Sequence, residues 1–352
     1  MKVAIDVMGG DFAPRELVLG ARQYLESGKA ELMLVGRRSD ILAVWPEAES
    51  RCEVIDTPEM VEMGESPTTA LRKKKNASVA VAARLVKEGR ASCFLSAGST
   101  GAQMAASLLE IGRVPGVERP AIAVMLPTAS GNGVLVLDVG ANVDCRPNHL
   151  VQFAHMGVSY YEAICRVEKP KIGVLNIGGE AGKGNELTKS VYELLEKQNG
   201  TLNFVGNILL KASEGLSDLI MGTIKQGVAK AGIPAEMANA VLGNLRRVRT
   251  DAPEYSGAPL LGIGGCSIVC HGKFKAASIA NAIHLAAQYG ASDVVKHIAS
   301  RLHGGQQQGD QDADDGDDDK QFDERECPRG GSLGVHWDSP CLMKCIHSTI
   351  AQ

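Results

Sequence analysis

The amino-acid sequence predicts an α/β fold, with a doubly wound mixed sheet that carries an inserted antiparallel hairpin. Short apolar runs typical of strands alternate with helical segments from the first residues onward. Several of these runs end in glycine-rich turns, as do strands that lead into helices around a binding cleft. Between two further apolar runs lies Ser130-Gly131-Asn132-Gly133, and its Asn-Gly pair is typical of a hairpin turn.

The strand and helix segments follow one another in a regular order. Residues 2–7 predict the first strand, and residues 14–27 predict a helix with Pro14 in its first turn. Further strands are predicted at residues 32–36, 52–56, 92–96, 121–126, 134–138, 171–177 and 202–205, and further helices at residues 68–89, 100–112, 149–167 and 185–197. From residue 206 to residue 302 the pattern is mostly helical, apart from a predicted loop at residues 251–265.

The chain divides into an α/β domain at residues 1–303 and a tail at residues 304–352. The tail begins as low-complexity Gly, Gln and Asp and holds 11 acidic and 4 basic side chains, so we expect it to be disordered and outside the fold. Without the tail, 33 basic residues stand against 30 acidic ones. Basic clusters at residues 72–75 and 246–249 favour an acidic partner, whereas no nucleic-acid-binding motif is present.

The composition is typical of a protein of the reducing cytoplasm. Most of the 9 cysteines lie in apolar strand or helix patterns, and Cys266-x-x-x-Cys270 has no second pair at zinc-ligand spacing. We therefore expect buried thiols rather than disulfides or a metal site. No apolar run is long enough to span a membrane, and the start of the chain predicts a strand rather than a signal peptide, because Asp6 interrupts its apolar run.

Four glycine-rich turns that follow predicted strands are candidate anion sites. Backbone N–H groups at the start of a helix carry partial positive charge, so such turns bind phosphate or carboxylate groups. The strongest candidate is the turn at residues 96–101, where Ser99 and Thr100 add hydroxyl donors to two glycines. We expect the four turns to converge on one cleft at the strand ends of a single sheet. The turns begin at Asp6, Ser96, Asp138 and Asn176.

Other candidate residues have an ordinary structural alternative of similar weight. Asp6 and Asp11 can orient a ligand, or serve as turn and helix-entry residues. The segment at residues 178–184 matches neither the Walker A nor the dinucleotide-binding motif, so Lys183 is either a point charge for a phosphate or a solvated loop lysine. The candidate phosphate- and substrate-binding residues are Asp6, Gly9, Gly10, Asp11, Ser66, Thr68, Ser96, Gly98, Ser99, Thr100, Gly101, Asp138, Gly140, Asn142, Asn185 and His271.

Several long segments stand in an order found in one enzyme family. They include AIDVMGGDFAP at 4–14, MGESPTTALRKKKNAS at 63–78, FLSAGSTGA at 94–102, VLDVGANVDCRPNHLVQFAHMG at 136–157 and VLNIGGEAGKGNELTK at 174–189. Together they resemble bacterial phosphate acyltransferase, the acyl-ACP:phosphate transacylase of phospholipid synthesis. The resemblance covers nearly all of residues 1–303.

The resemblance implies a fold related to isocitrate dehydrogenase and phosphotransacetylase, a homodimer, and no metal or organic cofactor. It implies that inorganic phosphate attacks a fatty acyl thioester on acyl carrier protein, and that a membrane glycerol-phosphate acyltransferase consumes the acyl phosphate. Lys183 and Asn207 match positions that it implies to be catalytic. Phosphate dianion is already a competent nucleophile, which agrees with the lack of a Ser–His pair. An amphipathic stretch at residues 216–242 is a candidate for attachment to the inner face of the membrane.

The chain departs from the family pattern before Asn207. Family members have two Phe-Val-Gly-Asn-like segments, whereas this chain has one, at residues 204–207. A sheet strand and an aspartate between the two copies are therefore expected to be missing. Ser99 stands where the resemblance predicts Asn, and the tail matches nothing in the family.

The loss before Asn207 favours an alternative, a catalytically impaired binding or scaffold relative. A metal- and NAD-dependent dehydrogenase of the same fold is a third reading. It predicts a carboxylate cluster for Mg²⁺ and a set of arginines for the substrate, neither of which can be assembled from this sequence.

Overall fold

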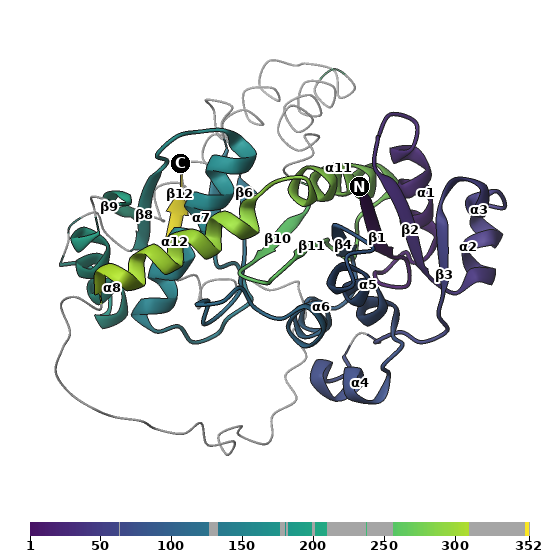
Figure 1. The fold of residues 1–352 in the computed structure, drawn as a ribbon, viewed down its shortest axis with the longest axis horizontal. Coiled ribbons are helices and arrows are strands. Elements are labelled where there is room, and N and C mark those ends of the chain that lie inside the picture. Colours follow the sequence, from purple (N-terminus) through teal and green to yellow (C-terminus); the bar gives the residue numbers. More distant parts are fainter. Residues whose placement is uncertain are drawn as a thin grey trace.

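The computed structural model describes residues 1–62, 64–126, 133–176, 180, 182–198, 201–209, 237, 256–309 and 349–351. Its strands form two sheets, one of seven and one of five strands. The seven-stranded sheet lies to the right in Figure 1 and the five-stranded sheet to the left. The chain crosses from one to the other at Ala123, whose N–H donates to the carbonyl oxygen of Pro259 at 2.9 Å.

The seven-stranded sheet confirms the predicted mixed α/β architecture. Its strands, in spatial order, are β3 (Glu53–Asp56), β2 (Glu31–Gly36), β1 (Lys2–Asp6), β4 (Cys93–Ser96), β11 (Cys266–Val269), β10 (Ala258–Leu261) and β5 (Ala121–Ile122). From β3 to β11 the neighbours are parallel, and β10 runs antiparallel to both β11 and β5.

Helices cover both faces of this sheet. The bounds are α1 (Arg15–Tyr24), α2 (Arg38–Val44), α3 (Ala48–Arg51), α5 (Ser78–Lys87), α6 (Thr100–Ala106) and α11 (Ala276–Gly290). Alternate residues of β1 serve opposite faces, since Ile5 packs with residues of α1 and α11 while Ala4 packs with residues of α5. Both side chains are fully buried. The near-continuous apolar strand runs reflect this two-sided burial.

The five-stranded sheet contains the predicted hairpin. Its order is β6 (Val124–Leu126), β7 (Val134–Leu137), β12 (Thr349–Ala351), β8 (Lys171–Asn176) and β9 (Asn203–Leu209). The antiparallel pairing of β6 with β7 confirms the hairpin, whose turn lies outside the described residues. The helices beside this sheet are α7 (Pro147–Cys165), α8 (Glu186–Lys197) and α12 (Val294–Gly309). Helix α7 lies close to β7, because a Cβ at Gly157 would stand 2.9 Å from Leu137.

The helix predicted at residues 68–89 is wrong in one respect, because the structure divides it. Helix α4 (Pro67–Lys73) ends before α5 begins at Ser78. Between them, the N–H of Asn76 donates to the carboxylate of Glu59 at 3.1 Å, and its carbonyl oxygen accepts from the hydroxyl of Thr57. These long-range contacts replace the intrahelical hydrogen bonds that the local pattern predicts.

Two other secondary-structure predictions need correction. The loop expected at residues 251–265 contains β10, and β11 follows it where mostly helical structure was expected. Both strands are only four residues long and have Gly or Pro beside or within them, which is also the composition of a loop. The helix predicted at residues 100–112 exists, but after Ala106 it continues as the π-helix η1 (Ser107–Ile111).

The expectation that all cysteines are free thiols is wrong for one pair. Cys93 and Cys266 are register partners on the neighbouring strands β4 and β11, with a Cα–Cα distance of 4.4 Å, and they form a disulfide. Spacing along the chain could not reveal this neighbourhood, because β11 was not predicted. Cys52, Cys145 and Cys270 are free thiols. Burial raises the pKa of Cys270 to about 12, which keeps this thiol protonated and unreactive.

The tail differs from the expectation at two places. Helix α12 continues through Gly309, and Thr349–Ala351 forms β12 inside the five-stranded sheet. Residues 310–348 lie outside the described residues, as do the basic cluster at 246–249 and all of the amphipathic stretch at 216–242 except Met237. Among the helices that the structure describes, none has the length and apolar character needed to cross a membrane.

Candidate functional site

The turns after β1 and β4 meet because these two strands are parallel neighbours. Asp6 and Ser96 are register partners at their carboxyl ends. The hydroxyl of Ser96 donates to Oδ2 of Asp6 at 2.6 Å, and its oxygen accepts from the N–H of Gly98 at 3.1 Å. The N–H of Met8 donates to Oδ1 of Asp6 at 3.1 Å. The two predicted site residues therefore bind each other and fix the two turns together.

Asp6 lies in a desolvated position. Burial raises the pKa of its carboxyl group, and hydrogen bonds from Ser78, Ser96 and the N–H groups of Met8 and Gly9 partly oppose this rise. The side chain is only 2% exposed. The carboxylate of Asp6 thus accepts hydrogen bonds from the strand and turn residues around it. Ser78 was missed in the sequence, where it follows the basic cluster without a motif of its own.

Gly9 permits the close approach of the two turns. A Cβ at this position would stand 2.7 Å from the backbone nitrogen of Gly98 and 2.8 Å from Oγ of Ser96, distances too short for real Cβ atoms. Gly10 has a φ of +111°, which L side chains rarely adopt. Both glycines of the predicted turn are thus required by the backbone.

A third turn, after β11, joins the same edge of the sheet. The N–H of Asp11 donates to the carbonyl oxygen of Gly272 at 2.9 Å. His271 is exposed, and its Nδ1 accepts from the N–H of Lys273 at 3.1 Å. Asp11 and His271, two of the candidate binding residues, are therefore exposed beside the turns after β1 and β4.

The first turn of α6 lies beside the Asp6–Ser96 pair. Ser99 is its N-cap, with Oγ accepting from the N–H of Ala102 at 3.4 Å. Thr100 is exposed, and Gly101 lies against Pro67, since a Cβ there would stand 2.9 Å from Cγ of Pro67. The N–H groups of a first helical turn have no intrahelical acceptor, so this end of α6 can bind an anion.

A small pocket lies over these turns. Asp6, Ser96, Gly98 and Ser99 contribute its polar lining together with Ser78. Its apolar lining comes from Met8, Met60, Val61, Val79 and Ala102. The cavity volume is about 10 Å³, which is roughly the room that one water molecule needs.

Ser66 and Thr68 lie at the start of α4, next to this pocket. Ser66 occupies the N-cap position, and its hydroxyl donates to Oγ1 of Thr69 at 3.3 Å rather than to a backbone group. Thr68 is exposed. The contact of Pro67 with Gly101 places both residues near the turn that begins α6.

The turn after β7 lies in the other sheet and has a different character. The carboxylate of Asp138 accepts from the N–H groups of Ile122, Ala141 and Asn142 at 2.9, 3.1 and 2.7 Å, and from Nδ2 of Asn142 at 2.8 Å. Asn142 also donates from Nδ2 to the carbonyl oxygen of Pro120 at 2.8 Å. Asp138 and Asn142 are 4% and 8% exposed. Their hydrogen bonds to Ile122 and Pro120 connect the two sheets, which is a structural role.

The turn after β8 carries Lys183. Nδ2 of Asn176 donates to the carbonyl oxygen of Lys183 at 2.9 Å, and Asn185 caps α8 by accepting from the N–H of Thr188 at 2.9 Å. Gly184 has a φ of +96°, and a Cβ there would stand 2.1 Å from Oγ1 of Thr188. The lysine side chain is exposed. Asn176, where the sequence places the start of this turn, thus holds the backbone of Lys183.

The predicted residues thus fall into two groups, one on each sheet. Asn207 pairs with Val174 in the register of β9 with β8, on the sheet of Lys183. Gly140, with a φ of +128°, belongs to the turn after β7. Met104 of α6 and Ala141 pack against the same small apolar cluster, so the groups are neighbours. The expectation that the four turns lie on a single sheet is wrong, because the strands that carry them divide between two sheets.

The described residues contain no group of three His, Cys, Asp or Glu side chains that could hold a metal ion. The Asp6, Asp11 and Asp138 carboxylates, which come from different turns, do not gather into such a group. The carboxylate cluster that a metal-dependent dehydrogenase requires is therefore not found among these residues.

Comparison with known proteins gives one family and one fold. The model of the fatty acid synthesis protein family matches residues 1–203 and again residues 199–297. A phosphate acyltransferase from Desulforamulus reducens is 44% identical over 326 residues, covering 86% of this chain and 97% of that protein. Another, from Moorella thermoacetica, is 45% identical over 312 residues, covering 81% and 91%.

Solved structures of low sequence identity share the fold. A phosphotransacetylase from Streptococcus pyogenes matches with a TM-score of 0.56 at 16% identity, covering 82% of this chain and 94% of that one. One from Staphylococcus aureus matches with a TM-score of 0.55, at the same identity and coverage. These matches confirm the expected phosphotransacetylase-like fold.

The family model matches in two segments, which overlap at residues 199–203, just before Asn207. The alignment with the Desulforamulus reducens protein has 326 positions, which is more than the number of residues in the 86% of this chain that it covers. The relative therefore has residues that face a gap in this chain. The junction of the two matched segments lies where the sequence predicts the loss of a strand.

Proposed function

This chain belongs to the fatty acid synthesis protein family and is an acyltransferase, and from this we propose that it transfers a fatty acyl group from acyl carrier protein to inorganic phosphate. The product is acyl phosphate for phospholipid synthesis. The proposal extends to a cytoplasmic homodimer, peripheral at most on the inner face of the membrane. A membrane glycerol-phosphate acyltransferase would consume the product.

Among the structural observations, the first turn of α6, which lies beside the Asp6–Ser96 pair, supports the proposal most directly. Phosphate needs N–H and O–H donors, and the turn at residues 99–101 offers backbone N–H groups with the hydroxyls of Ser99 and Thr100. The hydroxyl hydrogen of Ser96 is already donated to Asp6, so Ser96 positions this turn instead of binding phosphate.

The pocket over Asp6 has room for about one water molecule, so phosphate needs more space than it offers. Met60 and Val61 line it from a segment outside the sheet. Phosphate therefore either displaces this segment or binds at the exposed side of Thr100.

In the proposed reaction a phosphate oxygen attacks the carbonyl carbon of the thioester. The carbonyl oxygen becomes a tetrahedral oxyanion, which Lys183 and Asn207 stabilise. The carbon–sulfur bond then breaks, the thiolate of the carrier's prosthetic arm leaves with the bonding electron pair, and a solvent proton neutralises it. During the reaction Asp138 and Asn142 hold the two sheets together through their hydrogen bonds with Ile122 and Pro120.

The test is the formation of acyl phosphate from acyl-ACP and phosphate by the purified protein. Turnover that is lost in Lys183→Ala but kept in Lys189→Ala, an exposed lysine of α8, would support the proposal. Retention of turnover in EDTA and without nicotinamide would exclude the dehydrogenase reading.

One observation favours a second candidate, a catalytically impaired binding relative. The family match is split into two segments that overlap at residues 199–203, next to the proposed catalytic Asn207. A folded dimer that binds acyl carrier protein but forms no acyl phosphate would support this candidate over the enzyme.

A further inference from the structure

We propose that Arg72, Lys73 and Lys75 form the surface on which the acidic carrier protein docks to deliver its acyl group. We call these three residues the α4 basic surface, since two of them end α4 and the third follows it. The inference rests on the proposed function, because an acyl-carrying protein is the partner that the reaction needs. It adds the place where that partner binds.

The structure separates the four clustered bases by role. Nζ of Lys74 lies 2.8 Å from the carboxylate of Glu65 and 3.0 Å from the carbonyl oxygen of Met60, so this lysine points toward the protein. Arg72, Lys73 and Lys75 are exposed, and among the described residues no ion pair involves them. A set of adjacent cations without partners is available to an acidic protein.

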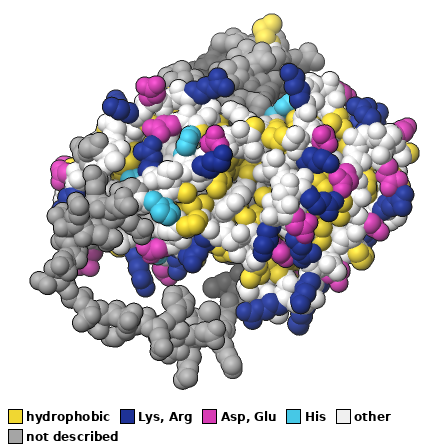
Figure 2. Space-filling view, viewed as in Figure 1, with side chains coloured by type: hydrophobic (Ala, Val, Ile, Leu, Met, Phe, Trp, Pro, Cys, Tyr) yellow, Lys and Arg dark blue, Asp and Glu magenta, His cyan; other side chains and the backbone are white. Residues whose placement is uncertain are grey.

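The acidic side chains nearby are largely committed to other groups. Glu65 is paired with Lys74, and Glu110 is paired with Arg84 at 2.9 Å. Glu59 accepts from the N–H of Asn76 and keeps its charge, so Glu59 and Glu62 stand against the three cations of the α4 basic surface. Positive charge therefore exceeds negative charge here. Figure 2 shows Lys and Arg side chains at the lower edge of the molecule, where Figure 1 places α4.

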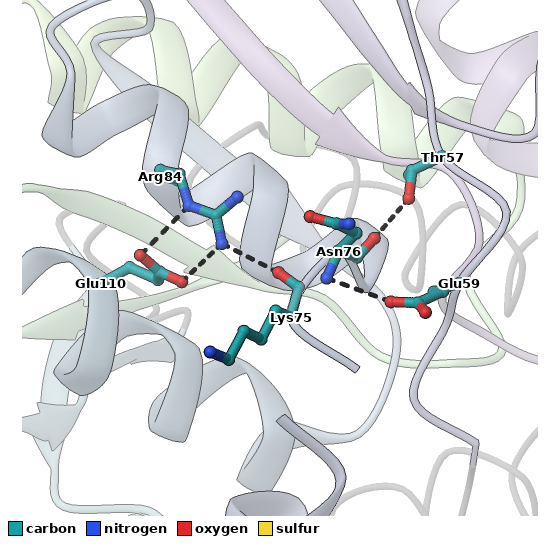
Figure 3. Close-up of polar contacts among 6 residues, drawn as sticks. All are labelled: Thr57, Glu59, Lys75, Asn76, Arg84 and Glu110. Atoms are coloured by element: carbon teal, nitrogen blue, oxygen red, sulfur yellow. Dashed lines mark hydrogen bonds and ion pairs between the residues drawn. The ribbon is translucent and has the colours of Figure 1, made fainter. Parts of the chain in front are cut away.

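The turn that carries Lys75 is held from two sides (Figure 3). Arg84 donates to the carbonyl oxygen of Lys75 at 2.8 Å, while the Lys75 side chain points away from this contact. On the other side, the backbone of Asn76 contacts Thr57 and Glu59. Groups fixed before binding lose less conformational entropy when the partner arrives, so this rigidity favours docking.

The α4 basic surface also lies close to the candidate phosphate site. Pro67, at the start of α4, contacts Gly101 in the first turn of α6. Lys74 connects the end of the same helix to Met60, which lines the pocket over Asp6. A carrier protein held on this surface would have its acyl thioester near the proposed nucleophile.

The decisive variant is Arg72→Gln/Lys73→Gln/Lys75→Gln, which removes three charges from exposed positions. We expect kcat/KM with acyl carrier protein to fall by about tenfold or more, mainly through KM, and its dependence on salt to weaken. With acyl-pantetheine, a neutral small thioester, kcat/KM should be unchanged. An equal fall with both substrates, or no fall with the carrier protein, would overturn the proposal.

Lys87→Gln is the matched control, because this exposed lysine lies at the opposite end of α5 from the α4 basic surface. It should leave the kinetics with acyl carrier protein unchanged. Direct binding of fluorescent carrier protein separates docking from chemistry. If the unmodified protein binds the carrier without turnover and the triple variant does not bind, docking stands while the proposed function fails. If the unmodified protein does not bind it, the docking proposal is wrong.

Discussion

Ser96 donates a hydrogen bond of 2.6 Å to Asp6, its register partner on the adjacent strand. The same hydroxyl oxygen accepts from Gly98, so one side chain joins the end of β1 to the turn that precedes α6. The motif suggests that Asp6 and Ser96 bind a ligand, whereas their hydrogen bonds fix the two turns that form the site. The groups left for a ligand are the donors around Ser99 and Thr100.

Asp6 should make the stability of the protein depend on pH. Its folded-state pKa is raised by burial, so its contribution is fully present below the unfolded pKa and is lost as pH rises through the folded pKa. The free energy of unfolding of the unmodified protein, relative to Asp6→Asn, should therefore decrease from pH 4 to pH 8. Each unit of pKa shift corresponds to about 1.4 kcal/mol. Urea unfolding across this range checks it, and a difference that rises with pH would contradict it.

Gly9→Ala should separate the turns after β1 and β4. Its Cβ would meet the backbone nitrogen of Gly98, which cannot move as a side chain can, so we expect a loss of about 1–3 kcal/mol and of acyl-phosphate formation. The control is Gly264→Ala, where the nearest atom would lie 3.8 Å from the new Cβ. Equal stability of the two variants would show that the close approach is not required.

Asp138→Ala should lower the stability of the folded protein, and any loss of turnover should follow from that loss of stability. It leaves the N–H groups of Ile122, Ala141 and Asn142 without their acceptor in a buried place, which costs about 1–3 kcal/mol for each group that stays unpaired. We expect the loss in thermal unfolding without substrate. An unchanged Tm with abolished turnover would instead make Asp138 a direct participant in the reaction.

The Cys93–Cys266 disulfide should make stability depend on reductant. Dithiothreitol should lower the Tm of the unmodified protein, because a disulfide of this kind contributes about 2–4 kcal/mol. The Tm of Cys93→Ala/Cys266→Ala should not respond. Counting thiols in the denatured, unreduced protein gives an independent check. The unmodified chain and Cys93→Ala/Cys266→Ala should give the same number, and two more thiols in the unmodified chain would exclude the bond.

Removal of β12 should weaken the five-stranded sheet. A chain ending at Gly309 would leave β7 and β8 without the strand that pairs with both. Ile350→Pro in the full chain removes one backbone N–H from the same strand and should have a smaller effect in the same direction. Unchanged urea unfolding in both variants would mean that β12 adds no stability.

The sequence was sufficient where the evidence is local. The turns that begin at Asp6, Ser96 and Asp138 lie at strand ends, as the apolar runs and glycines predict. It was insufficient where a residue's partner is distant in the chain. The commitment of Asp138 to Ile122, the inward contact of Lys74 and the pairing of Cys93 depend on tertiary neighbours that no local pattern encodes. The strands β10 and β11 were missed for the related reason that they gain their stability from β4 and β5.

The position of β12 sets an order of events during synthesis. The seven-stranded sheet has all its strands once residue 269 has left the ribosome, whereas the gap between β7 and β8 stays open until residues 349–351 emerge. Pairing at such a sequence separation is slow because the intervening chain loses much conformational freedom. The half of the molecule that carries Lys183 is thus completed after the half that carries Asp6, and the two edges of β7 and β8 are exposed to other chains in the meantime.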